Sequence, residues 1–169
     1  MALQKVPAII VTSEHLLIGE VETRGSRLLE VLTDPHSEYL HLHEVHVSRR
    51  EAKAKELVAL SELIVRKTEI CLAILGGGKH ESPETRRFAF VDKKSYAAFA
   101  IVAGYEVRGR LQLKGAHDPV TAMTHEIQGF MPLTHATLGH AGDHGEPLLA
   151  AVALCNREYI SLLHIGEEQ

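Results

Sequence analysis

The stretch Leu16-Leu17-Ile18-Gly19-Glu20-Val21-Glu22-Thr23 has a related counterpart, Glu106 to Leu113, at an offset of 90 residues. In the second stretch apolar residues alternate with polar ones around Gly109, and Gly19 occupies the matching place in the first. Alternation of period two is typical of a β-strand, and a glycine inside a strand marks sharp curvature or close approach of another backbone. We therefore expect a bent strand in each half of the chain.

The correspondence extends along both halves. At an offset of 90, or 91 after one extra residue in the second half, the matched pairs include Leu17 with Val107, Gly25 with Gly115, Tyr39 with Phe130, Val45 with Ala136 and Ile70 with Ile160. Glycine pairs are the stronger signal, because aliphatic strands often align by chance whereas glycine marks special backbone positions. We interpret the pattern as a tandem duplication; the alternative is one continuous domain whose strands share a period of two.

A glycine-rich, charged segment separates the two halves. The segment 76–87 carries three consecutive glycines, a proline and a cluster of charges between two apolar blocks, which is typical of a linker. The chain of 169 residues is long enough for one ordinary domain or two small ones. We predict a first β module over residues 1–78, a linker over 79–87 and a second module over 88–169.

Each half is expected to contain about five strands. The expected elements are hairpins over 6–23 and 96–113, short helical turns over 27–33 and 120–125, strands over 39–47 and 130–138, and closing strand pairs over 63–74 and 153–163. The charged segment 48–57 favours a solvated turn or helix. The pattern predicts a mainly β protein made of two tandem small antiparallel β-barrels with short helical turns.

These motifs resemble a known family. The bent strands with Gly19 or Gly109, the next strand, and the closing pair Ile64-Val65-Arg66-Lys67-Thr68-Glu69-Ile70-Cys71-Leu72-Ala73-Ile74 resemble the Sm-like, SH3-like small β-barrel. The second half, through 130–136 and 156–160, also resembles an uncharacterised bacterial module. The Sm resemblance implies RNA binding and ring-shaped oligomers that form by pairing of edge strands.

Charge disfavours RNA as the partner. The chain has 18 Lys and Arg against 22 Asp and Glu, a net charge of −4, and lacks the Asp and Asn pattern of the Sm RNA-binding loop. Only 5% of the residues are aromatic, so few side chains are available to stack on bases. RNA binding remains an alternative function, and its candidate contacts are Arg24, Arg27, Arg49, Arg50 and Lys114.

Cysteines and hydropathy bear on the compartment. Cys71 and Cys155 both lie inside apolar strand-like runs, which is typical of core residues in a reducing compartment. No run approaches the ~20 apolar residues that span a bilayer, and the apolar stretch near the N-terminus is too short for a signal peptide. We expect a cytoplasmic protein with no membrane partner.

Twelve histidines are the residues that suggest chemistry, and several fall in two groups. In the first group, alternation places His41 and His43 on one face of a strand, where two imidazoles at this spacing can share a metal. The same alternation places His46 on the other face, with Leu42 and Glu44. A third ligand has to come from elsewhere, with His15 or His36 as candidates.

The second group of histidines lies around a glycine-containing loop. It consists of His135, His140 and His144, with Asp143 beside them. Such a loop can bring several imidazoles together around Zn²⁺ or a similar ion. The two groups are not copies of each other, because His41 aligns with Pro132 and His43 with Thr134. A metal-binding protein, or a metalloenzyme with Glu44 as base, is therefore a further alternative.

Sequence signatures of catalysis are otherwise missing. The run Gly76-Gly77-Gly78-Lys79 lacks the spacing of a phosphate-binding loop, and no serine or cysteine lies in a nucleophile elbow. We expect a non-catalytic protein that assembles or binds a protein or small ligand. Homo-oligomerisation through strand edges is the expected partnership, and no cofactor is expected unless a divalent metal such as zinc binds the histidines.

Overall fold

The computed structural model describes residues 3–50, 55–76, 93–115, 118–140 and 145–167. The fold is mainly β, and ten strands form one antiparallel sheet. The strands are β1 Lys5–Val11, β2 His15–Glu22, β3 Tyr39–Arg49, β4 Glu56–Arg66, β5 Leu72–Leu75, β6 Lys94–Val102, β7 Tyr105–Leu113, β8 Phe130–His140, β9 Leu148–Asn156 and β10 Ile160–Gly166. The helical elements are α1 Leu28–Thr33, η1 Lys67–Glu69, α3 Pro119–Thr121, η2 Ala122–Glu126 and η3 Arg157–Tyr159.

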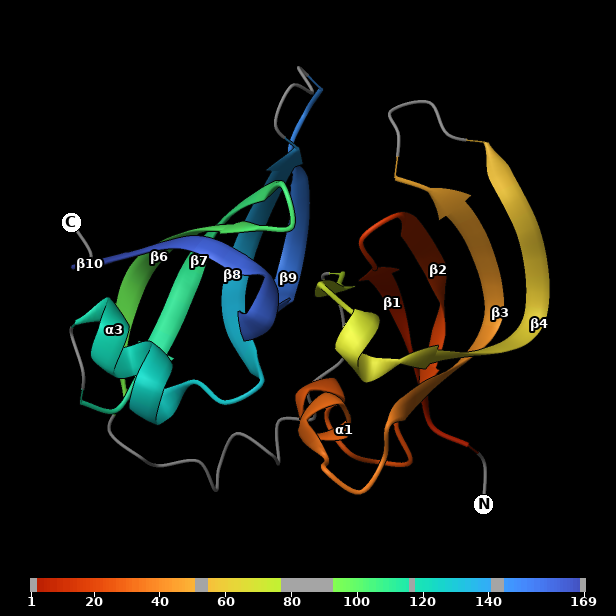
Figure 1. The fold of residues 1–169 in the computed structure, drawn as a ribbon, viewed down its shortest axis with the longest axis horizontal. Helices are drawn as coiled ribbons and strands as arrows, with labels where there is room; N and C mark the ends of the chain where they lie inside the picture. The colour runs from red at the N-terminus through yellow and green to blue at the C-terminus, as the bar shows by residue number, and fades with distance from the viewer. Residues whose placement is uncertain (1–2, 51–54, 77–92, 116–117, 141–144, 168–169) are drawn as a thin grey trace.

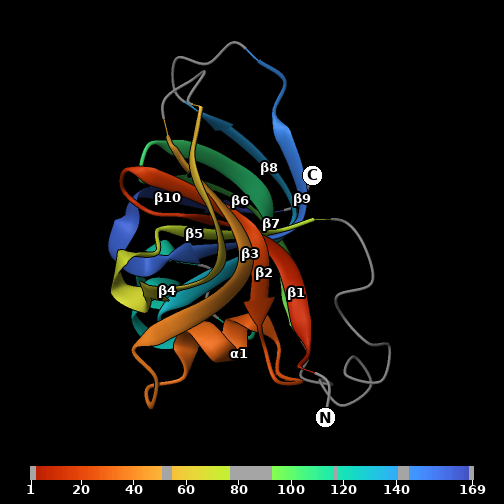
Figure 2. The same ribbon diagram turned by 90° about the vertical axis from the view of Figure 1, so that its right-hand side faces the viewer.

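The sheet runs through both halves of the chain. Its order is β10-β6-β7-β8-β9-β5-β1-β2-β3-β4, so the second half contributes the first five strands and the first half the other five. Figure 1 shows the two halves as two lobes, with β1 to β4 in one and β6 to β10 in the other. In Figure 2 the strongly curved β3 and β4 lie towards the viewer. The predicted linker 79–87 lies outside the described residues.

The same pairings occur in both halves. Ala8 pairs with Gly19 between β1 and β2, and Ala98 pairs with Gly109 between β6 and β7, at an offset of 90. The register of β2 with β3 shifts between Ile18 and Glu20, and that of β7 with β8 shifts between Arg108 and Arg110. The bends expected at the two glycines therefore coincide with irregular pairing.

Close backbone approach explains why both positions are glycine. A Cβ added at Gly19 would lie 2.9 Å from the carbonyl oxygen of His43, and one at Gly109 would lie 2.9 Å from that of Thr134. The approaching strands, β3 and β8, bulge next to these contacts at Glu44 and His135, each of which has a φ of 48°. The sequence feature that suggested curvature therefore marks a contact between adjacent strands.

Two apolar clusters form the core, and the strands at the centre of the sheet contribute to both. Leu72 and Ile74 of β5 belong to the cluster of the second half, whereas Ala73 and Leu75 belong to that of the first half. This division follows from the alternation of side chains across a strand. β5 is paired along both edges, with β1 and with β9, and all four of its residues are buried.

Polar contacts add to the joining of the two halves. The buried side chain of Asn156 donates from Nδ2 to the carbonyl oxygen of Ile70 over 2.8 Å. Arg50 donates to the carbonyl oxygens of Thr12 and Ala103, and its guanidinium lies 4.7 Å from the centre of the Tyr105 ring. The two halves are therefore packed against each other along a shared sheet.

Two expectations need correction. The sequence predicted two tandem small β-barrels, whereas the ten strands form one large sheet that is not closed, in which β5 and β9 pair across the two halves. The charged segment 48–57 was expected to be a turn or helix, but its two ends belong to β3 and β4, where Ser48 pairs with Glu56, while residues 51–54 lie outside the described residues. Cross-strand pairing overrides the helical propensity of this segment at both of its ends.

Candidate functional site

A buried carboxylate lies at the end of β2. Glu22 is its last residue, and the side chain is only 6% exposed. The antiparallel register pairs Val21 with Leu42, which brings Glu22 beside His41 on the neighbouring β3. A buried carboxylate requires partners, because an unpaired charge away from water is costly. The residues around Glu22 therefore form a candidate site.

Three histidines of β3 point away from the core, which differs in part from expectation. Leu40, Leu42 and Val45 are buried, whereas His41 and His43 are half-buried and His46 is exposed. The prediction placed His46 on the face of Leu42, and this is wrong. The bulge at Glu44 inserts one residue into the alternation, so the side chains that follow it exchange faces.

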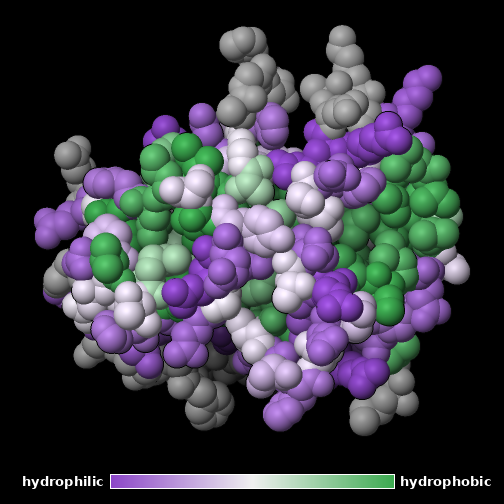
Figure 3. All heavy atoms as spheres, viewed as in Figure 1, coloured by the Kyte–Doolittle hydropathy of each residue, from purple (hydrophilic) through white to green (hydrophobic). Residues whose placement is uncertain are grey.

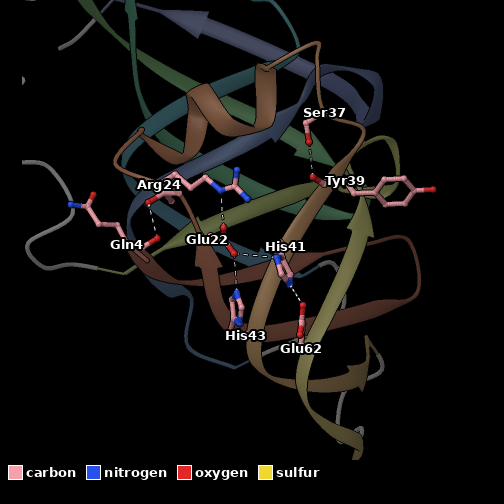
Figure 4. A network of polar contacts seen from close by, with 9 residues as sticks. Gln4, Glu22, Arg24, Ser37, Tyr39, His41, His43 and Glu62 are labelled. Atoms are coloured by element: carbon pink, nitrogen blue, oxygen red, sulfur yellow. Dashed lines mark hydrogen bonds and ion pairs between the residues drawn. The ribbon is translucent and has the colours of Figure 1, made fainter. Parts of the chain in front are cut away.

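Both neighbouring imidazoles approach the same oxygen of Glu22. Nδ1 of His41 and Nε2 of His43 each lie 3.1 Å from Oε2. The ring centres of the two histidines are 4.4 Å apart. The opposite side of the His41 ring contacts Glu62 of β4, with 2.5 Å between Nε2 and Oε1. Figure 4 shows these side chains converging from three adjacent strands.

Arg24 completes the surroundings of Glu22. Its Nε donates to Oε1 of Glu22 over 2.8 Å, while most of the Arg24 side chain is exposed. This bond, followed by the one from His43, lowers the pKa of Glu22 from 4.5 to about 2 against an opposing effect of burial. Glu22 is therefore ionised at neutral pH and available to bind a cation.

A groove of about 410 Å³ opens next to the cluster. Glu22, Arg24 and His41 line one part of it, and Tyr39 and Lys67 are among the other lining residues. Lys67 is occupied structurally, because its Nζ donates over 2.5 Å to the carbonyl oxygen of Val31 near the end of α1. The groove therefore gives solvent and small solutes access to Glu22 and His41.

The third residue of the cluster, Glu22, was not among the metal-ligand candidates predicted from the sequence. His15 lies at the opposite end of the β2–β3 pair, opposite Arg49, and His36 lies in the loop before β3. Glu22 is instead the residue that approaches both imidazoles. The signal that could have found it was the pairing of 15–22 with 39–49, which places the ends of these segments side by side.

The second histidine group is only partly described. His135 is exposed at the bulge of β8, and His140, also exposed, contacts the Tyr105 ring with 5.1 Å between ring centres. Asp143 and His144 lie outside the described residues. Among the residues that the structure describes, Glu22, His41 and His43 are the group of three whose ligand atoms all lie within 4.8 Å of one another.

The basic residues proposed for RNA binding are spread over the molecule. Arg24 and Arg27 flank the turn between β2 and α1, whereas Arg49 and Arg50 lie at the other end of the β2–β3 pair. Arg50 is engaged in the contact between the halves, and Lys114 follows β7 in the second lobe. This placement does not assemble one basic surface, so it gives no support to RNA binding.

The cysteines are core residues. Both thiols are free and buried, and burial raises the pKa of Cys155 to about 12. Burial also raises the pKa of Cys71. Since a thiolate is needed for nucleophilic attack or metal ligation, neither cysteine is suited to chemistry in the folded protein.

The outer edges of the sheet are a second candidate site. Ile64 of β4 is 59% exposed and Leu162 of β10 is 47% exposed. Figure 3 shows apolar residues gathered on the side where Figure 1 places β4, and a second apolar patch over the lobe that carries β10. Within the described part of the chain, β4 and β10 are each paired along one edge only.

Comparison of the chain with protein-family models, with curated proteins and with solved structures finds no match. None of the described helices is long and apolar enough to cross a membrane.

Proposed function

We propose that this protein is a non-catalytic assembly module built from two Sm-like halves, and that copies of the chain associate head to tail by pairing β4 of one with β10 of the next. The observation that carries the proposal is the junction of β5 with β9 inside the chain. This junction pairs the last strand of the first half with the fourth strand of the second half. The two free edges are formed by β4, which is the fourth strand of the first half, and by β10, which is the last strand of the second half.

The internal junction also provides a register for the external one. Within the chain Leu72 pairs with Cys155 and Ala73 pairs with Leu154. At the offset of 90, Leu162 of β10 matches Leu72 of β5, and Val65 of β4 matches Cys155 of β9. The same register between two copies therefore places Leu162 opposite Val65 of the neighbouring copy. The next pair in this register is Leu163 with Ile64. The proposal therefore specifies which residues meet.

Burial at the two places supports this arrangement. Leu154 is 2% exposed at the internal junction, whereas Ile64, at the matching position on β4, is 59% exposed. Likewise Leu72 is fully buried, whereas Leu162, its match on β10, is 47% exposed. Pairing of the free edges would cover apolar side chains and satisfy backbone groups that are otherwise left to solvent.

The repeated strand order supports the Sm-like assignment of each half. The first half has the order β5-β1-β2-β3-β4, and the second has β10-β6-β7-β8-β9. The pairings of β3 with β4 recur in β8 with β9, since Leu40 meets Val65 and Met131 meets Cys155. Because the proposed contact joins two different surfaces, it is heterologous and produces a closed ring or an open filament.

A complementation experiment tests the head-to-tail contact. Ile64→Lys places a charge on the β4 edge, and Leu162→Lys places one on the β10 edge. Each variant alone loses one half of the contact and should be monomeric by light scattering, whereas wild-type protein should form oligomers across the micromolar range. A mixture of the two variants retains one intact β4 edge and one intact β10 edge, so it should form a one-to-one dimer and nothing larger.

A matched control is Ile18→Lys, which puts the same charge on an exposed apolar residue of the interior strand β2. This variant should assemble like the wild type. A wild-type protein that stays monomeric throughout the micromolar range would refute the proposal. So would self-association of Leu162→Lys alone, because that result indicates contact between two β4 edges rather than between β4 and β10.

A further inference from the structure

We propose that Glu22, His41 and His43 form a binding site for a divalent transition metal of the zinc class, independent of the assembly function. The three residues come from two adjacent strands, β2 and β3. Two imidazoles and one carboxylate are a ligand set that suits Zn²⁺, with a fourth position left for water.

The spacing of the ligand atoms fits a tetrahedral ion. Ligands about 2.0–2.1 Å from zinc at tetrahedral angles are about 3.3 Å from one another. Oε2 of Glu22 lies 3.1 Å from Nδ1 of His41 and 3.1 Å from Nε2 of His43. Ligand atoms of the three residues all lie within 4.8 Å of one another, so rotations of the side chains can place them around one ion.

The hydrogen bonds of His41 also favour a metal. Its Nδ1 faces Glu22 and its Nε2 faces Glu62, so both nitrogens meet carboxylate oxygens. Without a metal and with both carboxylates ionised, both contacts can be hydrogen bonds only if the imidazole carries two protons. With a metal on Nδ1, a neutral ring donates from Nε2 to Glu62, which is the usual carboxylate–histidine–metal arrangement.

The carboxylate ligand is held in a similar way. Arg24 donates to Oε1 of Glu22, and this leaves Oε2 directed at the two imidazoles. A ligand fixed by an outer hydrogen bond loses little freedom when a metal binds. The groove that Glu22 and His41 line supplies a path for the ion and for the water in the fourth position.

The site is confined to the first half, although the strand pairings that carry it occur twice. In the second half the positions of Glu22, His41 and His43 are occupied by Gln112, Pro132 and Thr134. The sheet of the second half forms without any of the three ligands. The cluster is therefore not required by the fold itself, and its confinement to one half is consistent with a binding role.

The test uses full-length protein without an affinity tag, treated with a chelator and titrated with Zn²⁺ in a calorimeter. We expect one zinc ion per chain, with binding abolished by His43→Ala and by Glu22→Gln. Co²⁺ should give the intense visible bands of a tetrahedral complex. Glu62→Gln should weaken zinc binding about tenfold, because it removes the partner that orients His41.

His46→Ala is the matched control. His46 lies on the same strand and the same face, and its Nδ1 contacts Glu56 over 2.6 Å, but it is outside the group of three. Its removal should leave zinc affinity unchanged. Circular dichroism verifies that each variant is folded, and Leu162→Lys should bind zinc like the wild type because its substitution lies in the other lobe.

Three results would overturn the proposal. The first is the absence of stoichiometric zinc binding, which leaves only the contacts between the histidines and the carboxylates. The second is unchanged affinity in folded His43→Ala, which places the ion elsewhere, for example at the histidines of the second half. The third is an equal loss of affinity in His46→Ala, which indicates non-specific binding to surface histidines.

Discussion

At the scale of single residues, Glu22 shows how a sheet can hold a buried charge. Its carboxylate accepts from Arg24 on one oxygen and faces two histidines on the other. Arg24 lies two residues further along the chain, whereas the histidines come from the neighbouring strand. The burial of Glu22 is therefore compensated partly by local sequence and partly by strand pairing.

This environment predicts an acid-sensitive contribution to stability in the metal-free protein. The pKa of Glu22 is lowered from 4.5 to about 2, chiefly by the bond from Arg24. A lowered pKa means that the unfolded state binds the proton first, so the contribution is complete above pH 4.5 and is lost as the pH falls towards 2. Urea unfolding of chelator-treated protein should show this loss, and Glu22→Gln should lack it.

The matched control for this measurement is Glu20→Gln, which removes one carboxylate from the same strand. It should retain the acid-dependent loss seen in the wild type. If Glu22→Gln and the wild type lose stability in parallel between pH 5 and pH 2, the assignment to Glu22 is wrong.

At the scale of elements, the bulges of β3 and β8 decide which side chains reach the surface. Each bulge lies against a glycine of the adjacent strand, Gly19 or Gly109. The bulge at Glu44 sends His46 to the same side as His41 and His43. Simple alternation could not predict this, because the extra residue becomes visible only when two strands are paired.

Gly19→Ala should therefore destabilise the protein by about 1–3 kcal/mol, since the added methyl group overpacks a close backbone contact. Its Cβ would meet the carbonyl oxygen of His43 at 2.9 Å and Cγ2 of Val45 at 3.1 Å. Gly139→Ala on β8 is the control, because no atom lies within 4 Å of a Cβ placed there. Denaturant unfolding compares the two variants, and equal stability of both would contradict the packing argument.

At the scale of the whole molecule, the junction of β5 and β9 makes the two lobes interdependent. Each apolar cluster contains residues from the opposite half: Val11, Leu72 and Ile74 belong to the second, and Phe130 and Leu154 to the first. Asn156 lies at this junction, and its backbone N–H donates to the carbonyl oxygen of Cys71. Neither half can therefore complete its core without the other.

Asn156→Ala should destabilise the whole chain by about 1–3 kcal/mol, because it leaves the carbonyl oxygen of Ile70 without its buried donor. Arg66→Ala removes the exposed residue at the matching position of the free edge and should cost less than about 1 kcal/mol. Both variants are compared in the Leu162→Lys background, so that association does not contribute. A smaller effect at Asn156 than at Arg66 would contradict this account of the junction.

The amino-acid pattern was sufficient to predict a mainly β chain, buried cysteines, bends at Gly19 and Gly109, and a shared face for His41 and His43. These features depend on the local alternation of apolar and polar residues and on glycines, which mark special backbone positions. Pairing between distant segments decided the rest: the single open sheet, the reversal of His46 and the recruitment of Glu22. Register and strand order arise from contacts between residues far apart in the chain, which no local pattern contains.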